Sequence, residues 1–188
     1  MTNLASPYNK EICYFTKTSD TFLRKSDFKY FDKKVRYSKK NYYKSYYKSI
    51  LVGNKTLNIN HNFSSLIGAI NSSYYILNLT DCWDGENAEP IKNDIYFITI
   101  EYLVNLTDFI YNNFNVIIAV PEINPCKDGS LDLEWRTNEN VLLINLKSSN
   151  NLDIHYYGEN KITNNSIKGI SKTIAINEDL CFWMKKLV

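Results

Sequence analysis

Short apolar and polar alternations, separated by turn residues, fill the second half of this chain and limit the folds open to it. Leu131, Leu133 and Trp135 alternate with polar residues, as in a strand with one buried face. The Asp-Gly pair in 127–130 favours a hairpin turn directly before them. Further strand patterns occupy residues 141–146, 152–157 and the stretch around 167–176, and the prolines of 121–125 favour an extended backbone before them. We therefore predict an antiparallel β-meander of about four strands.

The sequence predicts one helix before this meander and one after it. A stripe of apolar residues predicts a long helix that begins at Pro90 and ends near Asn112, since proline suits the first helical position. Its members are Ile95, Ile98, Tyr102, Leu106, Phe109 and Ile110. Asn177 is placed to cap a closing helix from Glu178 to Leu187. The predicted fold class is α+β, with a long helix packed on the meander and a closing C-terminal helix.

The N-terminal part has weaker and more mixed patterns. Asn41 to Val52 repeats aromatic and apolar residues at helical spacing and meets Gly53-Asn54, which suits a helix C-terminus. A second helix is predicted from Phe63 to Leu79. We divide the chain into a basic, tyrosine-rich segment of mixed α/β structure, 1–80, and an α+β domain, 81–188.

Charge is distributed unevenly between these parts. Ten basic residues against Asp27 and Asp32 give the stretch from Arg24 to Lys48 a net charge of +8, so the remainder carries −6. Such a basic element indicates an anionic partner. Interleaved tyrosines could stack on the bases of a single strand, or could be buried against a core or a protein. The residues expected to contact a partner are Lys39, Lys40, Tyr42, Tyr43, Lys44, Tyr46, Tyr47 and Lys48.

Two motifs in residues 81–188 carry a resemblance. Residues 83–91 read W-D-G-x-x-A-x-P-I, and residues 128–135 read D-G-x-Φ-x-Φ-E-W, where Φ is apolar. This pair is similar to that of a widespread group of small bacterial proteins. The resemblance implies the fold and a bacterial or phage-related origin, but no activity. The residues alone predict that Trp83 and Trp135 are core or lid aromatics, that Asp84 caps a turn, and that Glu134 pairs with Arg136 or Lys147.

Catalytic signatures are sparse. Neither His61 nor His155 has an acid or a nucleophile at a sequence spacing that would indicate a catalytic base. The four cysteines, Cys13, Cys82, Cys126 and Cys181, form no C-x-x-C pair and read as free thiols. The best enzymatic set resembles the PD-(D/E)-x-K nucleases, which hold Mg²⁺ with two acids beside a lysine. It consists of Asp132, Glu134, Asn145 and Lys147, where Asn145 replaces the second acid.

These observations favour a non-catalytic protein-binding module, an inhibitor or antitoxin-like regulator of a bacterial or phage defence-type enzyme. The alternatives are a nucleic-acid-binding protein that uses segment 24–48, and a degenerate metal-dependent nuclease. We expect no cofactor and no bound metal. The N-terminus shows no signal peptide and no apolar run is long enough to cross a bilayer, so a cytoplasmic protein is expected. The sequence leaves the partner and the oligomeric state open.

Overall fold

A computed structural model describes residues 47–148, 152–171 and 174–188. The chain divides into two units, Met1–Tyr43 and Lys44–Val188, and all the described residues belong to the second. Its helices are α1 (Ser64–Ser73), α2 (Asn93–Phe114) and α3 (Glu178–Met184), with short 3-10 helices η2 (His61–Phe63) and η3 (Tyr74–Asn78). Its strands are β1 (Tyr47–Val52), β2 (Lys55–Asn60), β3 (Glu122–Pro125), β4 (Leu131–Arg136), β5 (Asn140–Ser148), β6 (Leu152–Asn160) and β7 (Ser166–Ser171).

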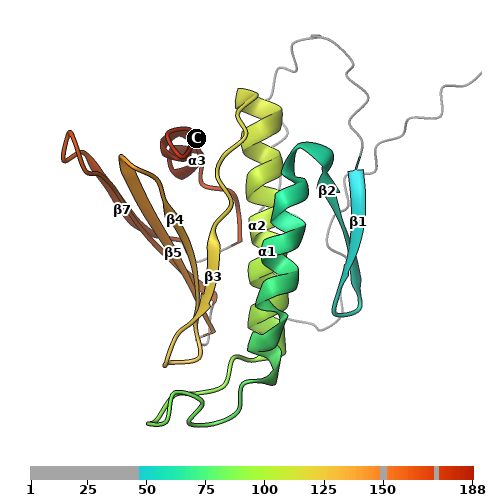
Figure 1. Cartoon of the computed structure of the whole chain (residues 1–188). Helices are drawn as coiled ribbons and strands as arrows, with labels where there is room; N and C mark the ends of the chain where they lie inside the picture. Colours follow the sequence, from blue (N-terminus) through green and yellow to red (C-terminus); the bar gives the residue numbers. More distant parts are fainter. Residues whose placement is uncertain (1–46, 149–151, 172–173) are drawn as a thin grey trace, which may run out of the picture. The chain divides into compact units, whose positions relative to one another are not determined.

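The predicted meander is present and has five strands. β3, β4, β5, β6 and β7 pair in sequence order, and every pair is antiparallel. The count exceeds the prediction of about four because the short stretch at β3 hydrogen-bonds along β4 as a full edge strand. The mixed α+β class is confirmed, and the sheet lies to one side of α1 and α2 in Figure 1.

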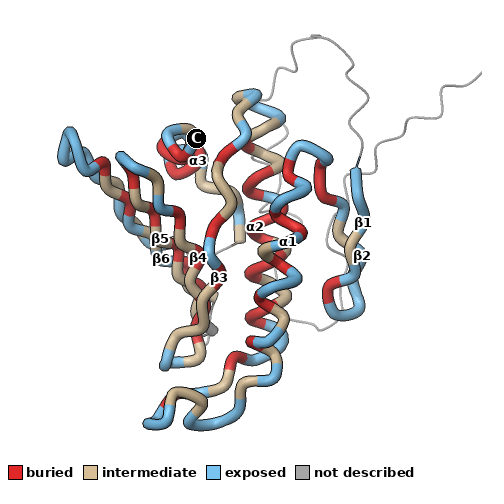
Figure 2. The backbone as a smooth tube through the Cα atoms, viewed as in Figure 1, coloured by how far each residue is buried: buried red, intermediate tan, exposed pale blue. Residues whose placement is uncertain are grey.

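The predicted alternation places one face of this sheet in the core. Leu131, Leu133 and Trp135 are fully buried, while Asp132 and Glu134 on the same strand remain partly exposed. Burying side chains of this size is worth about 1.5–3 kcal/mol each. In Figure 2 the buried segments lie between the sheet and the helices and along α2. The opposite surface of the sheet is called the outer face below.

Helix α2 forms the centre of the core but starts later than predicted. Ile95, Tyr102, Leu106 and Ile110 are buried, which confirms the apolar stripe. The helix begins at Asn93 rather than Pro90, because the backbone just before Pro90 is held elsewhere: the Glu89 amide donates to the Lys127 carbonyl at 2.8 Å. It ends at Phe114, two residues after the predicted Asn112, with Asn115 in the left-handed conformation at φ 54°.

The segment predicted as a helix from Asn41 to Val52 is corrected over its described part. Residues 47–52 form β1, which pairs with β2 in a hairpin closed by Gly53 and Asn54. Gly53 does adopt a positive φ, +62°, but as the first residue of a two-residue hairpin loop rather than as a helix end. The helical spacing was misleading because most of the tyrosines that carried it precede residue 47, whereas β2 supplies a strand partner.

The second N-terminal helix is present in two pieces. α1 covers Ser64–Ser73 and η3 continues to Asn78, and Leu66, Ile67 and Ile70 on its inner side are buried. The Ser73 hydroxyl, where the α-helix ends, lies 2.7 Å from the Tyr96 hydroxyl of α2. The hairpin thus packs on α2 through β2, and α1 contacts both β2 and β3, so that it lies between the hairpin and the first strand of the five-stranded sheet (Figure 1).

The predicted boundary near residue 80 falls inside this shared core. Val52, Ile59, Phe63 and Ile76 join the same cluster of buried apolar residues as the helices and strands that follow. The Phe63 ring also lies edge-on to the Tyr111 ring of α2, with centroids 6.0 Å apart. Apolar burial therefore carries the folded unit N-terminally past residue 80.

Differences at the C-terminal end are smaller. β6 continues to Asn160, three residues beyond the prediction, and β7 ends at Ser171 instead of Ile176. The predicted cap of α3 is confirmed, since Asn177 Oδ1 accepts the Leu180 amide at 2.9 Å. The helix itself ends at Met184, before the predicted Leu187.

Replacing Gly53 with alanine should destabilise the fold. A Cβ atom at Gly53 would lie 2.7 Å from a Phe97 ring carbon, and the positive φ disfavours an L-residue. We expect Gly53→Ala to lower the free energy of unfolding by about 1–3 kcal/mol in urea denaturation. The matched control is Gly68→Ala, which meets nothing within 4 Å on α1 and should raise stability by about 0.5–1 kcal/mol. Equal effects of the two changes would contradict this account of the hairpin.

Candidate functional site

The two motifs of the resemblance meet in space. The loop around Asp84 lies against the β3–β4 turn, where Lys127 Nζ is 3.0 Å from Asp84 Oδ2 and 2.7 Å from Glu86 Oε2. Glu89 forms an isolated parallel bridge with Asp128. A Cβ atom at Gly129, where φ is +73°, would meet Glu89 and Pro90 atoms at 3.4–3.6 Å. Lys127 therefore joins two segments that are distant in sequence.

Asp84 caps its own loop as predicted. Its Oδ1 accepts the backbone amides of Glu86 at 2.8 Å and of Ala88 at 3.2 Å. The Glu86 amide is the main cause that lowers the pKa of Asp84, and the Lys127 ammonium adds to it. The carboxylate is therefore charged at neutral pH and acts here as a structural acceptor.

The tryptophans divide between core and loop. Trp135 is fully buried and its Nε1 donates to the Ala119 carbonyl at 2.8 Å. Trp83 is half-buried, and its Nε1 donates to the Glu89 carbonyl at 3.0 Å. The prediction of a core aromatic is confirmed for Trp135, whereas Trp83 braces the loop that precedes α2.

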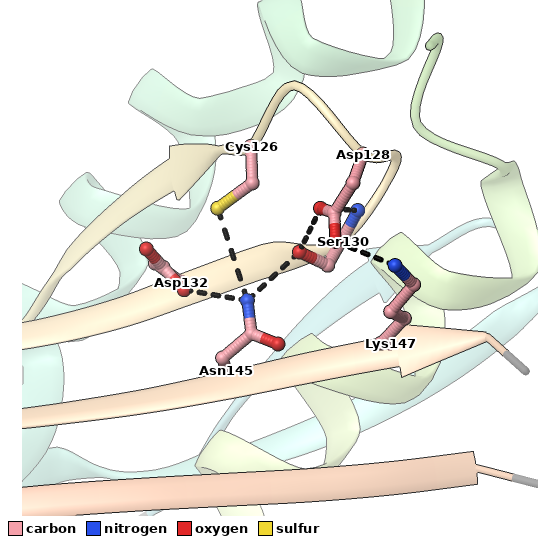
Figure 3. Close-up of polar contacts among 6 residues, drawn as sticks. All are labelled: Cys126, Asp128, Ser130, Asp132, Asn145 and Lys147. Carbon is pink, nitrogen blue, oxygen red and sulfur yellow. Dashed lines mark hydrogen bonds and ion pairs between the residues drawn. The ribbon is translucent and has the colours of Figure 1, made fainter.

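Asp132, Asn145 and Lys147 of the nuclease-like set lie close together, but their polar atoms are already used in hydrogen bonds to each other or to neighbouring side chains (Figure 3). Asn145 Nδ2 donates to Asp132 Oδ1 at 2.7 Å and to Ser130 Oγ at 2.8 Å. Lys147 reaches away from them to Asp128 Oδ2, at 2.6 Å. Asn145 thus presents its amide hydrogens, not its oxygen, to the acid with which it was expected to share a cation.

Glu134, the remaining member of that set, pairs with Arg136 two residues along the same strand. One of the two predicted partners is therefore confirmed. Across the described ranges, no group of three or more histidine, cysteine, aspartate or glutamate side chains is arranged to hold a metal ion.

Cys126 was predicted only as a free thiol and Ser130 was given no role of its own, and both belong to this cluster. Cys126 Sγ lies 3.8 Å from Asn145 Nδ2. Burial, followed by the neighbouring Asp132, raises the pKa of Cys126 to about 12, so the thiol is a poor nucleophile at neutral pH. Ser130 is fully buried, although it is one of the polar residues that alternate with Leu131 and Leu133 in the sequence, and its hydroxyl lies 2.6 Å from Asp128 Oδ1. The Asp-Gly-Ser turn was the one available signal for this pairing.

Three of the cysteines and both histidines are described. Cys82, Cys126 and Cys181 are free thiols, as predicted for these three, and Cys13 lies outside the described residues. His61 is exposed in η2 and His155 is exposed on β6.

The predicted partner-binding residues fall largely beyond the described ranges. Tyr47 and Lys48 are exposed on β1. The others, Lys39, Lys40, Tyr42, Tyr43, Lys44 and Tyr46, lie outside the described residues.

An aromatic and basic cluster that the sequence analysis missed lies where α2 and α3 end. The Phe114 ring packs edge-on against Phe109 and against Phe182, with centroids 6.4 Å apart in both cases. Lys185 Nζ lies 4.5 Å from the Phe182 centroid and 4.9 Å from that of Phe114. The Phe182 side chain is nevertheless 63% exposed. We call Phe109, Phe114, Phe182 and Lys185 the phenylalanine cluster.

Comparison with known proteins identifies no relative: no family model, curated protein or solved structure matches this chain. Within the described residues, no helix combines the length and apolar character that crossing a membrane requires.

One buried acid should make stability depend on pH. Asp108 on α2 is only partly exposed, and no described side chain pairs with it. Burial raises its pKa to about 6. The unfolded chain titrates near 3.9, so the contribution of Asp108 to stability is greatest below about pH 4 and falls as the pH rises through 6.

Asp108→Asn should therefore raise the free energy of unfolding at pH 7.5 by about 1–2 kcal/mol. The gain should shrink as the pH falls from 7 to 4.5, because the wild-type carboxyl becomes protonated. Urea denaturation across this range measures it, with Glu139→Gln as the exposed control. A pH-independent gain would contradict the assigned cause.

Proposed function

We propose that this chain is a non-catalytic protein-binding module, an inhibitor or antitoxin-like regulator of a bacterial or phage defence-type enzyme. The observation that carries the proposal is the phenylalanine cluster. Aromatic and cationic residues are enriched where binding energy concentrates in protein interfaces. An exposed phenylalanine with a lysine over its ring has this composition.

The cluster is presented rigidly, which supports the same proposal. Leu180, Cys181 and Met184 of α3 are fully buried, and Asn177 fixes the start of the helix. Phe182 therefore projects from an anchored helix, so little side-chain or backbone entropy would be lost when a partner covers it. A contact on such a site binds more tightly than the same ring on a loose loop.

The polar cluster near the β3–β4 turn also favours binding over catalysis. A general base or a metal ligand needs lone pairs that substrate or metal can reach. Asp132 accepts from Asn145, and Asp128 accepts from Lys147 and Ser130. These interactions brace the turn and supply no nucleophile.

The protein-binding proposal predicts that Phe182 is a binding hot spot. Tagged full-length protein is to be expressed in the organism that encodes it, and the retained partner identified, purified and titrated calorimetrically. Phe182→Ala should raise the dissociation constant by about 30-fold, the loss of affinity typical of a hot-spot aromatic. Ile162→Ala, which removes another exposed apolar side chain, should leave it unchanged.

The purified partner should also lose its enzymatic activity when the wild-type chain is added, and less so with Phe182→Ala. The proposal fails if no reproducible partner is found, if both variants bind like the wild type, or if binding leaves the partner's activity intact.

A second candidate function is nucleic-acid binding by the basic segment, residues 24–48. The observation in its favour is that Tyr47 and Lys48 are both exposed on β1. As consecutive strand residues they point to opposite faces of the hairpin, so each offers one of the two contacts that single-stranded nucleic acid needs, a ring for a base and an ammonium for phosphate.

This alternative predicts salt-dependent binding to labelled single-stranded and double-stranded DNA and RNA. Changing Lys39, Lys40, Lys44 and Lys48 together to alanine should weaken binding and reduce the slope of log affinity against log salt by about 3, since each released phosphate contact contributes about 0.7–0.9. The matched control changes Lys92, Lys161, Lys172 and Lys186, which removes the same charge elsewhere. Equal losses in the two variants, or no binding at low salt, would rule out a role for this segment.

A further inference from the structure

The outer face of the five-stranded sheet carries exposed apolar and aromatic side chains. Tyr157 is 46% exposed and Ile170 is 59% exposed. With Leu143, His155 and Lys168 they line a shallow depression across β5, β6 and β7. The described helices lie on the other side of the sheet (Figure 1). An apolar centre with a polar rim has the anatomy of a protein interface.

The strand register arranges this face into cross-strand rows. One row runs Glu122, Glu134, Leu143, Tyr157 and Lys168, from β3 to β7, because each residue pairs with the next across the sheet. Leu143 on the central strand is its midpoint. The row is acidic at one end and basic at the other.

The two neighbouring rows also place polar groups on either side of β5. Towards the β3–β4 turn, Asn124, Asp132, Asn145, His155 and Ile170 form the next row. Its acid lies on β4 and its histidine on β6, on either side of Asn145.

In the third row the charges are exchanged relative to the second, with the basic residue on β4 and the acidic residue on β6. Arg136 on β4 and Glu159 on β6 lie on either side of Val141. β5 lies at the centre of each row, and each row holds one complementary pair at equal numbers of strands to either side: Glu122 and Lys168, Asp132 and His155, or Arg136 and Glu159. Asn124 and Ile170, at the ends of the second row, are not complementary. A two-fold axis parallel to β5 would bring the members of each complementary pair over one another.

We propose that a second copy of this chain docks on the outer face, so that two five-stranded sheets stack face to face about a two-fold axis parallel to β5. Such an interface is self-complementary, as in most homodimers. Sheets stack about 10 Å apart with their strands within about 30° of each other, which long charged side chains can span.

The axis predicts specific contacts. Glu122 lies opposite Lys168 of the second copy, Asp132 opposite His155, and Arg136 opposite Glu159. Each occurs twice, because the interface is symmetric. Within their own chain, Asp132 already accepts from Asn145 and Arg136 already pairs with Glu134, so Glu122 and Lys168 carry most of the charge complementarity. On the axis, Leu143 and Val141 each meet their own counterparts and form the apolar centre together with Tyr157.

One pair on the axis has like charges. Lys147 of the two copies would face each other, but each ammonium already lies 2.6 Å from Asp128 Oδ2 of its own chain. This local pairing offsets the repulsion, since a compensated charge interacts weakly across solvent at the interface edge.

Charge exchange between two variants tests the proposal on the full chain. Sedimentation velocity over a concentration series gives the dimer dissociation constant of the wild type, of Lys168→Glu and of Glu122→Lys. Each variant places like charges opposite each other twice and should dimerise at least about tenfold more weakly. An equimolar mixture of the two variants restores both contacts and should form a heterodimer of near wild-type affinity.

Lys92→Glu is the control, since it makes the same charge change on an exposed lysine before α2 that belongs to none of the three rows. It should dimerise as the wild type does. Circular dichroism of each variant confirms that the chains remain folded.

Weakened single variants together with a restored mixture support the proposal. A monomeric wild type at high micromolar concentration overturns it, as does a dimer that either charge reversal leaves unchanged or that the mixture fails to restore. The inference is independent of the protein-binding proposal, because Phe182 does not belong to the outer face.

Discussion

Burial of one face of an antiparallel sheet against α2 is the constraint on which the rest of this structure depends. Leu131, Leu133, Trp135 and Ile144 are fully buried on that face. Trp135 also has the polar end of its ring satisfied by the Ala119 carbonyl, so this fully buried ring carries no unpaired donor. Because side chains alternate along a strand, fixing this face also fixes which residues stand on the outer one.

The two motifs of the sequence form one structural unit, the contact between the Asp84 loop and the β3–β4 turn, which we call the clasp. Lys127 joins the Asp84 loop to the β3–β4 turn, and the Glu89 amide donates to the carbonyl of the same lysine. This arrangement explains why Asp-Gly recurs in both motifs: Gly85 and Gly129 both have positive φ angles, which glycine adopts without strain. The motifs therefore describe how the start of α2 is attached to the sheet, and they need no catalytic explanation.

The sequence predicted correctly those parts of the fold that depend on interactions between residues close together in the chain. The alternation in β4, the Asp-Gly turn and the Asn177 cap were read correctly, since each depends on neighbours in sequence. β1 was missed because its identity comes from pairing with β2, and the start of α2 was misplaced because Glu89 is held by a later turn. The candidate site was limited in the same way, since only the folded chain brings Phe114 to Phe182 or turns Lys147 towards Asp128.

The nearest-neighbour order of the sheet has a consequence for how the chain folds. Because β3 to β7 pair strictly in sequence, each new strand closes only a short loop, and such topologies form faster than those built from distant pairings. The clasp at Lys127 is the exception, since the Asp84 loop gains its partner only after the β3–β4 turn exists. The slow step is therefore expected to be the docking of the α1–α2 layer on a meander that is already largely formed.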